Sequence, residues 1–141
     1  HKRLWRLSGD RATLDKAISF YERGFDLRKD YYNGENAAIC LEFRSVAQKD
    51  ADEAKFDRMS ANKIRGSIIG NLEAAISEDG FDQRSDLLWV FATLANCYFA
   101  LNEDGKGEEF EQNFYTLSEA DWEKQTYLEG KNSVLAFRTS T

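Results

Sequence analysis

The sequence predicts an all-α domain in which paired helices stack into a right-handed α-α superhelix, a solenoid closed by a C-terminal capping helix. Proline is absent from all 141 residues, which favours long uninterrupted helices. Apolar side chains recur at steps of three and four residues along most of the chain, as they do on one face of an α-helix. No run alternates apolar and polar residues convincingly, so we expect no sheet. We expect residues 1–141 to form a single domain.

The first part of the chain predicts two helices separated by a polar turn. The first covers residues 13–29, and four of its apolar residues share one face: Leu14, Ile18, Tyr21 and Phe25. Asp10 is a candidate N-cap for it. A second helix is expected over residues 35–43, with Asn33 as its candidate N-cap.

A highly charged stretch follows, and its first half leaves two readings open: a solvated helical extension or a loop. We expect residues 44–63 to be a charged insertion. Asp50 and Glu53 have the spacing of a capping box, which would start a long helix. The apolar line of that helix appears late, at Ile64, Ile68, Leu72, Ala75 and Ile76. Gly80 is expected to end it.

The second half predicts three further helices. Asp82 is a candidate cap for a helix over residues 83–101, and a short turn leads to a helix that carries Phe110 and Phe114. Ser118-x-x-Asp121 has the pattern of a capping-box variant and predicts the start of the last helix. Gly130 is expected to interrupt this helix.

The segment Leu94–Asn102 leads through a glycine-containing turn into Phe110 and Phe114, and this pattern resembles a tetratricopeptide repeat (TPR). In that family a small residue midway along the first helix precedes a tyrosine by three positions; a leucine, a turn and a second small residue follow. The residues at the matching places are Ala95, Tyr98, Leu101, Asn102 and Gly107. Gly107 replaces the usual alanine, and no proline ends the repeat. The resemblance implies about two and a half repeat units.

Residues 14–27 look like the second helix of an earlier repeat. The first helix of that repeat would lie in residues 1–11 and upstream, and the chain begins at His1 instead of Met, so we expect a fragment of a longer protein. The following pattern, Tyr32-x-Gly34-x-Asn36-x-Ala38, is similar to the TRAF-binding repeat region of apoptosis-signalling MAP kinase kinase kinases and its bacterial relatives. Those relatives are commonly attached to signalling or defence effector domains. The resemblance implies a scaffold or sensor module.

Charge and residue content disfavour several other functions. The net charge of −6 disfavours nucleic acid and anionic membranes as partners, and the basic residues of the first half are interleaved with acidic ones. His1 is the only histidine, so nucleophile–histidine pairs and histidine metal sites are not expected. We therefore expect no catalytic residue, no metal and no cofactor. A small carboxylate-dependent enzyme is the remaining catalytic hypothesis.

The sequence contains no recognisable membrane-spanning or secretory segment, so we expect a cytoplasmic protein. No apolar run is long enough to span a bilayer, and the basic N-terminus lacks the apolar core of a secretory signal. Cys40 and Cys97 are expected to be buried reduced thiols. If the preceding helix is missing, Leu4, Trp5 and Leu7 are exposed, which predicts self-association into a homodimer.

Five polar and aromatic residues are candidates for binding a partner: Tyr32, Asn36, Trp89, Asn96 and Phe99. In a TPR stack the first helices of successive pairs line a concave groove, and the position of Asn96 after the small packing residue directs it into that groove, with Asn36 as a second amide candidate. Asn96 could hydrogen-bond the backbone or terminal carboxylate of a peptide, because an amide both donates and accepts. Core packing is the competing interpretation for the aromatic residues. Asn36 could instead hold the start of its own helix.

The predicted function is therefore a protein-protein interaction module that binds a protein or peptide through the groove. The alternative is a regulatory or sensor region that controls a catalytic effector domain elsewhere in the parent chain.

Overall fold

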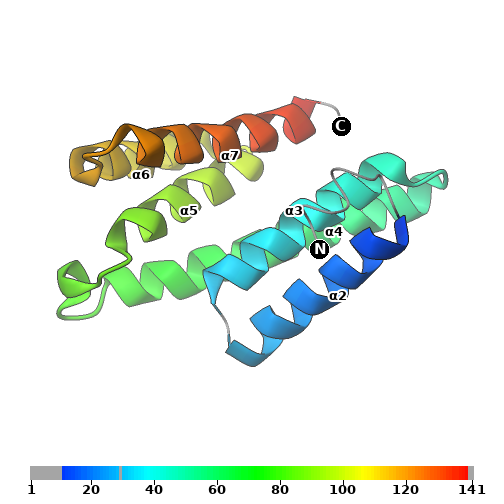
Figure 1. Cartoon of the computed structure of the whole chain (residues 1–141), viewed down its shortest axis with the longest axis horizontal. Helices are drawn as coiled ribbons and strands as arrows, with labels where there is room; N and C mark the ends of the chain where they lie inside the picture. Colours follow the sequence, from blue (N-terminus) through cyan, green and yellow to red (C-terminus); the bar gives the residue numbers. More distant parts are fainter. Residues whose placement is uncertain (1–10, 29, 140–141) are drawn as a thin grey trace. The chain divides into compact units, whose positions relative to one another are not determined.

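The computed structural model describes residues 11–28 and 30–139, and within these ranges it contains helices and no strand (Figure 1). The chain divides into two compact units, residues 1–68 and 69–141. The α-helices are α2 (Arg11–Arg28), α3 (Tyr31–Ala47), α4 (Ala51–Ile76), α5 (Leu87–Ala100), α6 (Asp104–Leu117) and α7 (Asp121–Thr139). A short 3-10 helix, η1 (Phe81–Gln83), precedes α5. The all-α prediction is confirmed.

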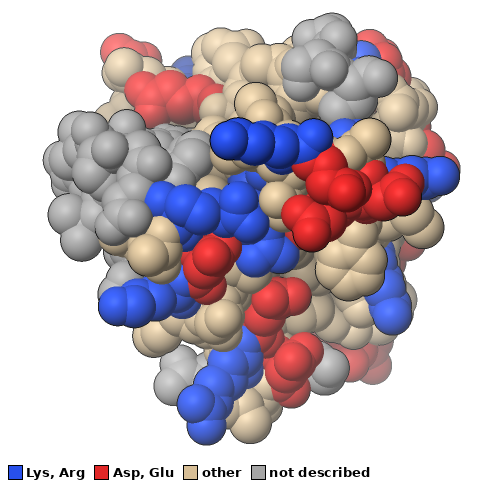
Figure 2. Space-filling view, turned by 90° about the vertical axis from the view of Figure 1, so that its right-hand side faces the viewer, with Lys and Arg blue, Asp and Glu red and all other residues tan. Residues whose placement is uncertain are grey.

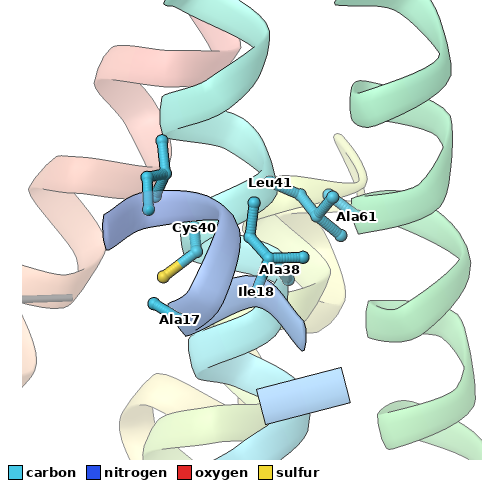
Figure 3. Packing of buried hydrophobic residues seen from close by; sticks show 7 residues of the cluster. Ala17, Ile18, Ala38, Cys40, Leu41 and Ala61 are labelled. Carbon is cyan, nitrogen blue, oxygen red and sulfur yellow. The ribbon is translucent and has the colours of Figure 1, made fainter. Parts of the chain in front are cut away.

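In the first unit, α2 packs along α3 through small and branched side chains. Figure 3 shows Ala17 and Ile18 of α2 facing the side chains of α3, with Ala61 of α4 at the edge of the same cluster. The full cluster is Leu14, Ala17, Ile18, Ala38, Cys40, Leu41 and Ala61. The alanines let the helices approach closely, and burial of the larger members supplies about 25 cal/mol per Å² of apolar surface removed from water.

The turn between α2 and α3 is organised by Asp30 and not by Asn33. The backbone of Asp30 is extended, and its carboxylate accepts hydrogen bonds from the backbone N–H of Asn33 at 2.9 Å and from the Asn33 side-chain amide at 2.9 Å. The prediction that Asn33 caps this helix is therefore wrong. An Asp with extended backbone just before the first turn satisfies helix N–H groups that have no partner within the helix.

The charged stretch is helical except at residues 48–50, which separate α3 from α4, so the first half of the stretch is mainly helix and not loop. Asp50 precedes α4, and its carboxylate accepts from the backbone N–H groups of Asp52 and Glu53. The buried face of α4 begins early and includes two charged residues; its members are Ala54, Asp57, Ala61, Arg65, Ile68 and Leu72. The apolar line that the sequence indicates begins only at Ile64, because two of the buried positions in this region are occupied by the charged residues Asp57 and Arg65.

In the second unit, α5 packs against α6 and α7 through aromatic rings. Tyr98 stacks on Phe110 with ring centroids 5.8 Å apart, and its hydroxyl donates to the carboxylate of Glu73 at the end of α4. Helix α5 begins at Leu87, and η1 occupies the residues just before it. The prediction that Asp82 caps a helix from residue 83 is therefore wrong. Gly80 has φ +84°, the left-handed conformation in which glycine is favoured, four residues after α4 ends.

Helix α7 runs without interruption through Gly130, contrary to the prediction. A Cβ at Gly130 would lie 3.1 Å from Nδ2 of Asn96, so this glycine permits the close approach of α7 to α5. The start of α7 is held by Glu123. Its carboxylate accepts from Ser118 Oγ and from the backbone N–H groups of Glu119 and Ala120. Asp121, the residue predicted for the capping box, does not make these bonds.

Gly107 of α6 lies under the ring of Phe99, which explains why it stands where TPRs usually have alanine. An added Cβ would lie 2.9 Å from the ring of Phe99, so this buried ring would have to shift to accommodate it. We expect Gly107→Ala to lower the free energy of unfolding by about 1–3 kcal/mol. Gly70→Ala is the matched control: it meets no neighbour within 4 Å and should raise stability by up to about 1 kcal/mol. Chemical denaturation measures both, and equal effects of the two variants would contradict this account.

Candidate functional site

Trp89 lies near the start of α5 and belongs to an aromatic pair that opens to solvent. Its ring is half-buried and rests on Phe114 of α6, with centroids 6.1 Å apart. On the other side it meets Trp122 of α7, at 6.0 Å and an interplanar angle of 35°. Trp122 is 62% exposed. We call Trp89 and Trp122 the tryptophan surface.

The sequence identified Trp89 as a candidate but missed Trp122. Nothing in a linear pattern pairs the first turn of α5 with the first turn of α7, because the contact depends on how the two helices cross. A large apolar residue among charged neighbours, as in Glu119-Ala120-Asp121-Trp122-Glu123, is the one signal that could have marked Trp122 as exposed.

Acidic side chains dominate the chain segments that flank the tryptophan surface. Residues 78–90 and 118–124 together carry seven acidic and two basic residues. One of the basic residues, Arg84, donates to both carboxylate oxygens of Asp86 at 2.9 and 3.0 Å. The backbone N–H of Ala120, followed by that of Glu119 and by the Ser118 hydroxyl, lowers the pKa of Glu123. This carboxylate is therefore ionised at neutral pH.

Asn96 and Phe99 also lie on the side of α5 that α7 approaches, but they are buried there. Asn96 is 4% exposed, its Nδ2 faces Gly130, and its Oδ1 has no hydrogen-bond partner among the described residues. The ring of Phe99 lies under Lys131 Nζ, 4.6 Å from the ring centroid, and its carbonyl accepts from Arg138 at 2.9 Å. The partner-binding role of these two residues stays a prediction, and α7 would have to move aside for a partner to reach them.

Tyr32 and Asn36 lie on α3 in the first unit and have different environments. Tyr32 is 64% exposed, and its ring meets Tyr21 edge-on at 6.5 Å. Asn36 is buried and donates from Nδ2 to the carbonyl of Tyr32 at 2.8 Å. This bond corresponds to the alternative role for Asn36, that of holding its own helix start. Of the two, Tyr32 is the side chain that a partner can contact directly.

The first unit also contains a network of charged groups that links α2, α3 and α4. Arg44 of α3 donates to both carboxylate oxygens of Asp57 on α4, at 3.0 and 2.9 Å, and reaches Asp15 of α2 at 3.3 Å. Gln48 adds a bond to Asp57 at 2.9 Å. Arg65, also buried, pairs with Glu42 at 2.7 Å. Part of the charged stretch is therefore not solvated, because Asp57 is only 1% exposed and Arg65 is fully buried.

Elsewhere the charges are interleaved, as the sequence indicates. Figure 2 shows Lys and Arg side chains lying next to Asp and Glu on the face that it presents. Across the part of the chain that the structure describes, no three His, Cys, Asp or Glu side chains form a group that could hold a metal ion. Cys40 and Cys97 are buried and not in a disulfide. None of the described helices has the length and apolar character that crossing a membrane requires.

Asp57 holds three helices together through Arg44, so its removal should be costly. We expect Asp57→Ala to lower the free energy of unfolding by about 3–5 kcal/mol, because Arg44 would be left half-buried without its main partner. Asp15→Ala removes a more exposed carboxylate of the same network and should cost about 1 kcal/mol or less. Denaturant unfolding compares them, and a loss in Asp15→Ala as large as that in Asp57→Ala would refute the assignment.

The contact between Asn96 and Gly130 predicts a coupling between two substitutions. In the unsubstituted protein, Gly130→Ala gains helix propensity but crowds the Asn96 amide. In the Asn96→Ala background that crowding is gone, so Gly130→Ala should be more stabilising there by about 1 kcal/mol. A double-mutant cycle measures the difference, and an identical effect in both backgrounds would show that the two residues do not touch.

Comparison with known proteins adds one finding. Residues 1–41 match the family model described as Tetratricopeptide Repeats-Sensor, TPR-S. No curated protein and no solved structure matches the chain. The described part of the matched segment comprises α2 and the first part of α3, the helix pair whose packing forms the cluster of the first unit. The similarity to the TRAF-binding repeat region stays a prediction. The chain therefore contains a TPR-like helical domain whose first part matches the TPR-S family.

Proposed function

We propose that the chain is a protein-protein interaction module that holds a protein or peptide partner on side chains displayed by its helices. The observation that carries the proposal is the tryptophan surface: Trp122 is largely exposed, and the half-buried ring of Trp89 contacts both Trp122 and Phe114. Exposed tryptophans supported by buried aromatic rings are typical of residues that dominate binding energy at interfaces. The match to a TPR-type family supports the same conclusion, because such repeats usually mediate protein interactions.

In its finer form, the proposal places the partner in the concave groove that the first helices of TPRs line. Tyr32 on α3 and Trp89 on α5 are the members of the predicted set with solvent-accessible rings. Preformed helices hold these rings in place, so little conformational entropy is lost when a partner binds. We further propose a cytoplasmic location, partners other than nucleic acid or membranes, and no catalytic activity in this chain. TPR-type repeats are generally non-catalytic, which supports the last point.

A regulatory role is the second candidate, and the description of the matched family as a sensor favours it. In this version the repeats control a catalytic effector domain elsewhere in the parent chain. The domain composition of the parent protein distinguishes the two: an adjacent effector domain supports regulation, and repeats alone support a scaffold. The predicted homodimer is a separate question, because Leu4, Trp5 and Leu7 lie outside the described residues. Sedimentation that gives a monomer would count against it.

Selection of binding peptides from a random displayed library tests the interaction proposal on the purified chain. We expect enriched peptides whose affinity falls about tenfold or more in Trp89→Ala, since buried interface tryptophans commonly contribute at least 1.4 kcal/mol. Phe56→Ala is the matched control, because Phe56 is an exposed aromatic residue of the first unit. Circular dichroism confirms that helicity is unchanged. The proposal would be overturned if the library yielded no enriched peptide, or if the enriched peptides bound Trp89→Ala as tightly as the unsubstituted protein.

A further inference from the structure

Charge is distributed unequally between the two units of the chain. Residues 69–141 contain 14 Asp and Glu and five Lys and Arg, a net charge of −9. Residues 1–68 contain 11 acidic and 14 basic residues, a net charge of +3. The chain's net charge of −6 therefore hides a strongly acidic second unit. The tryptophan surface belongs to that unit.

The acidic residues are concentrated in sequence around the two tryptophans. Trp122 stands between Asp121 and Glu123, and the peptide N–H of Trp89 donates to the carbonyl of Asp86 one turn earlier. The two flanking segments, residues 78–90 and 118–124, carry a net charge of −5. Of these carboxylates, Glu123 is engaged in capping α7 and Asp86 in pairing with Arg84. Asp121 and Glu119 are exposed on either side of the start of α7.

The aromatic geometry suits a cation. The face of an indole ring carries negative potential and attracts Lys or Arg side chains, more strongly than the other aromatic rings do. Trp122 presents such a ring to solvent, and Trp89 stands beside it at 6.0 Å. The pair is supported from below, because Phe114 contacts Trp89 and is itself packed on Tyr127 at 4.6 Å. These contacts hold the ring of Trp89 beside Trp122, which lowers the ordering cost of binding on this side.

We propose that the tryptophan surface binds a basic peptide segment of a partner protein. A Lys or Arg side chain of the segment lies over the exposed ring of Trp122, and neighbouring basic residues of the segment face Asp121 and Glu119. This inference rests on the proposed function and deepens it by naming the class of partner. Charge complementarity carries it: a unit with a net charge of −9 repels an acidic segment and attracts a basic one.

Three synthetic peptides of equal length test the inference against the whole chain. The first alternates Arg and Lys with Leu, the second replaces every basic residue with Gln, and the third replaces it with Glu. Binding is followed by calorimetry and by the indole N–H resonances in NMR spectra. We expect the basic peptide alone to bind and to shift the signals of Trp89 and Trp122. Raising the salt concentration should weaken its binding, because exposed charges are screened.

Variants then separate the aromatic contribution from the general attraction between opposite charges. Trp122→Ala should lower the affinity for the basic peptide by about fivefold to thirtyfold, the range expected from loss of a cation–π contact. The pair Glu119→Gln and Asp121→Asn should weaken it further and reduce the salt dependence. Phe56→Ala removes an exposed aromatic side chain from the first unit and should leave the affinity for the basic peptide unchanged.

Each other outcome has a definite meaning. If the basic peptide binds Trp122→Ala as tightly as it binds the unsubstituted protein, the binding reflects non-specific attraction between opposite charges and the inference is wrong. If the Gln peptide binds the tryptophan surface equally well, the partner is apolar: the inference fails and the proposed interaction function stands. If Trp122→Ala dissociates a dimer of the chain, the occupant is a second copy. If no peptide binds here and library selection also yields none, the proposed function fails as well.

Discussion

The described helices depend on neighbouring helices to bury their apolar faces, and the close approach of these neighbours is the constraint on which the other features depend. The approach occurs where side chains are small or missing. Ala17 and Ala38 permit it between α2 and α3, Gly107 permits it where α6 passes Phe99, and Gly130 permits it where α7 passes Asn96. In proteins most of the stability of a helix comes from packing its apolar face against a neighbour, so these helices depend on such contacts.

Helix α4 shows how the same constraint can be met with charged residues. Its buried face includes Asp57 and Arg65, which face Arg44 and Glu42 of α3. Ion pairs of this kind gain little over well-packed apolar groups, because both charges lose their hydration. They do require specific partners: Asp57 accepts two bonds from one guanidinium and a third from Gln48. They therefore favour a single register of α4 against α3, which apolar side chains alone specify less strictly.

Helix α7 decides which residues of α5 a partner can contact. Three candidate residues of α5, Trp89, Asn96 and Phe99, face the side that α7 approaches. Asn96 and Phe99, near the C-terminal end of α5, are buried against Gly130 and Lys131 of α7. Trp89, near the start of α5, contacts the exposed Trp122. The surface available for recognition in the second unit is therefore assembled from two helices, and it carries the negative charge of the segments that lead into both of them.

Periodicity, the absence of proline and the small residues at contact positions were sufficient to predict the all-α fold, the helix pairs and the TPR-like character, since these depend on local patterns. Sequence also named five candidate binding residues, of which the structure leaves the side chains of Tyr32 and Trp89 accessible and buries the other three. It could not place the Asp57 and Arg65 side chains in the interior, name Trp122 as the partner of Trp89, or show that Gly130 continues a helix. Each of those depends on which atoms a neighbouring helix brings within contact distance, and a distance between residues far apart in the chain exists only once the helices have packed.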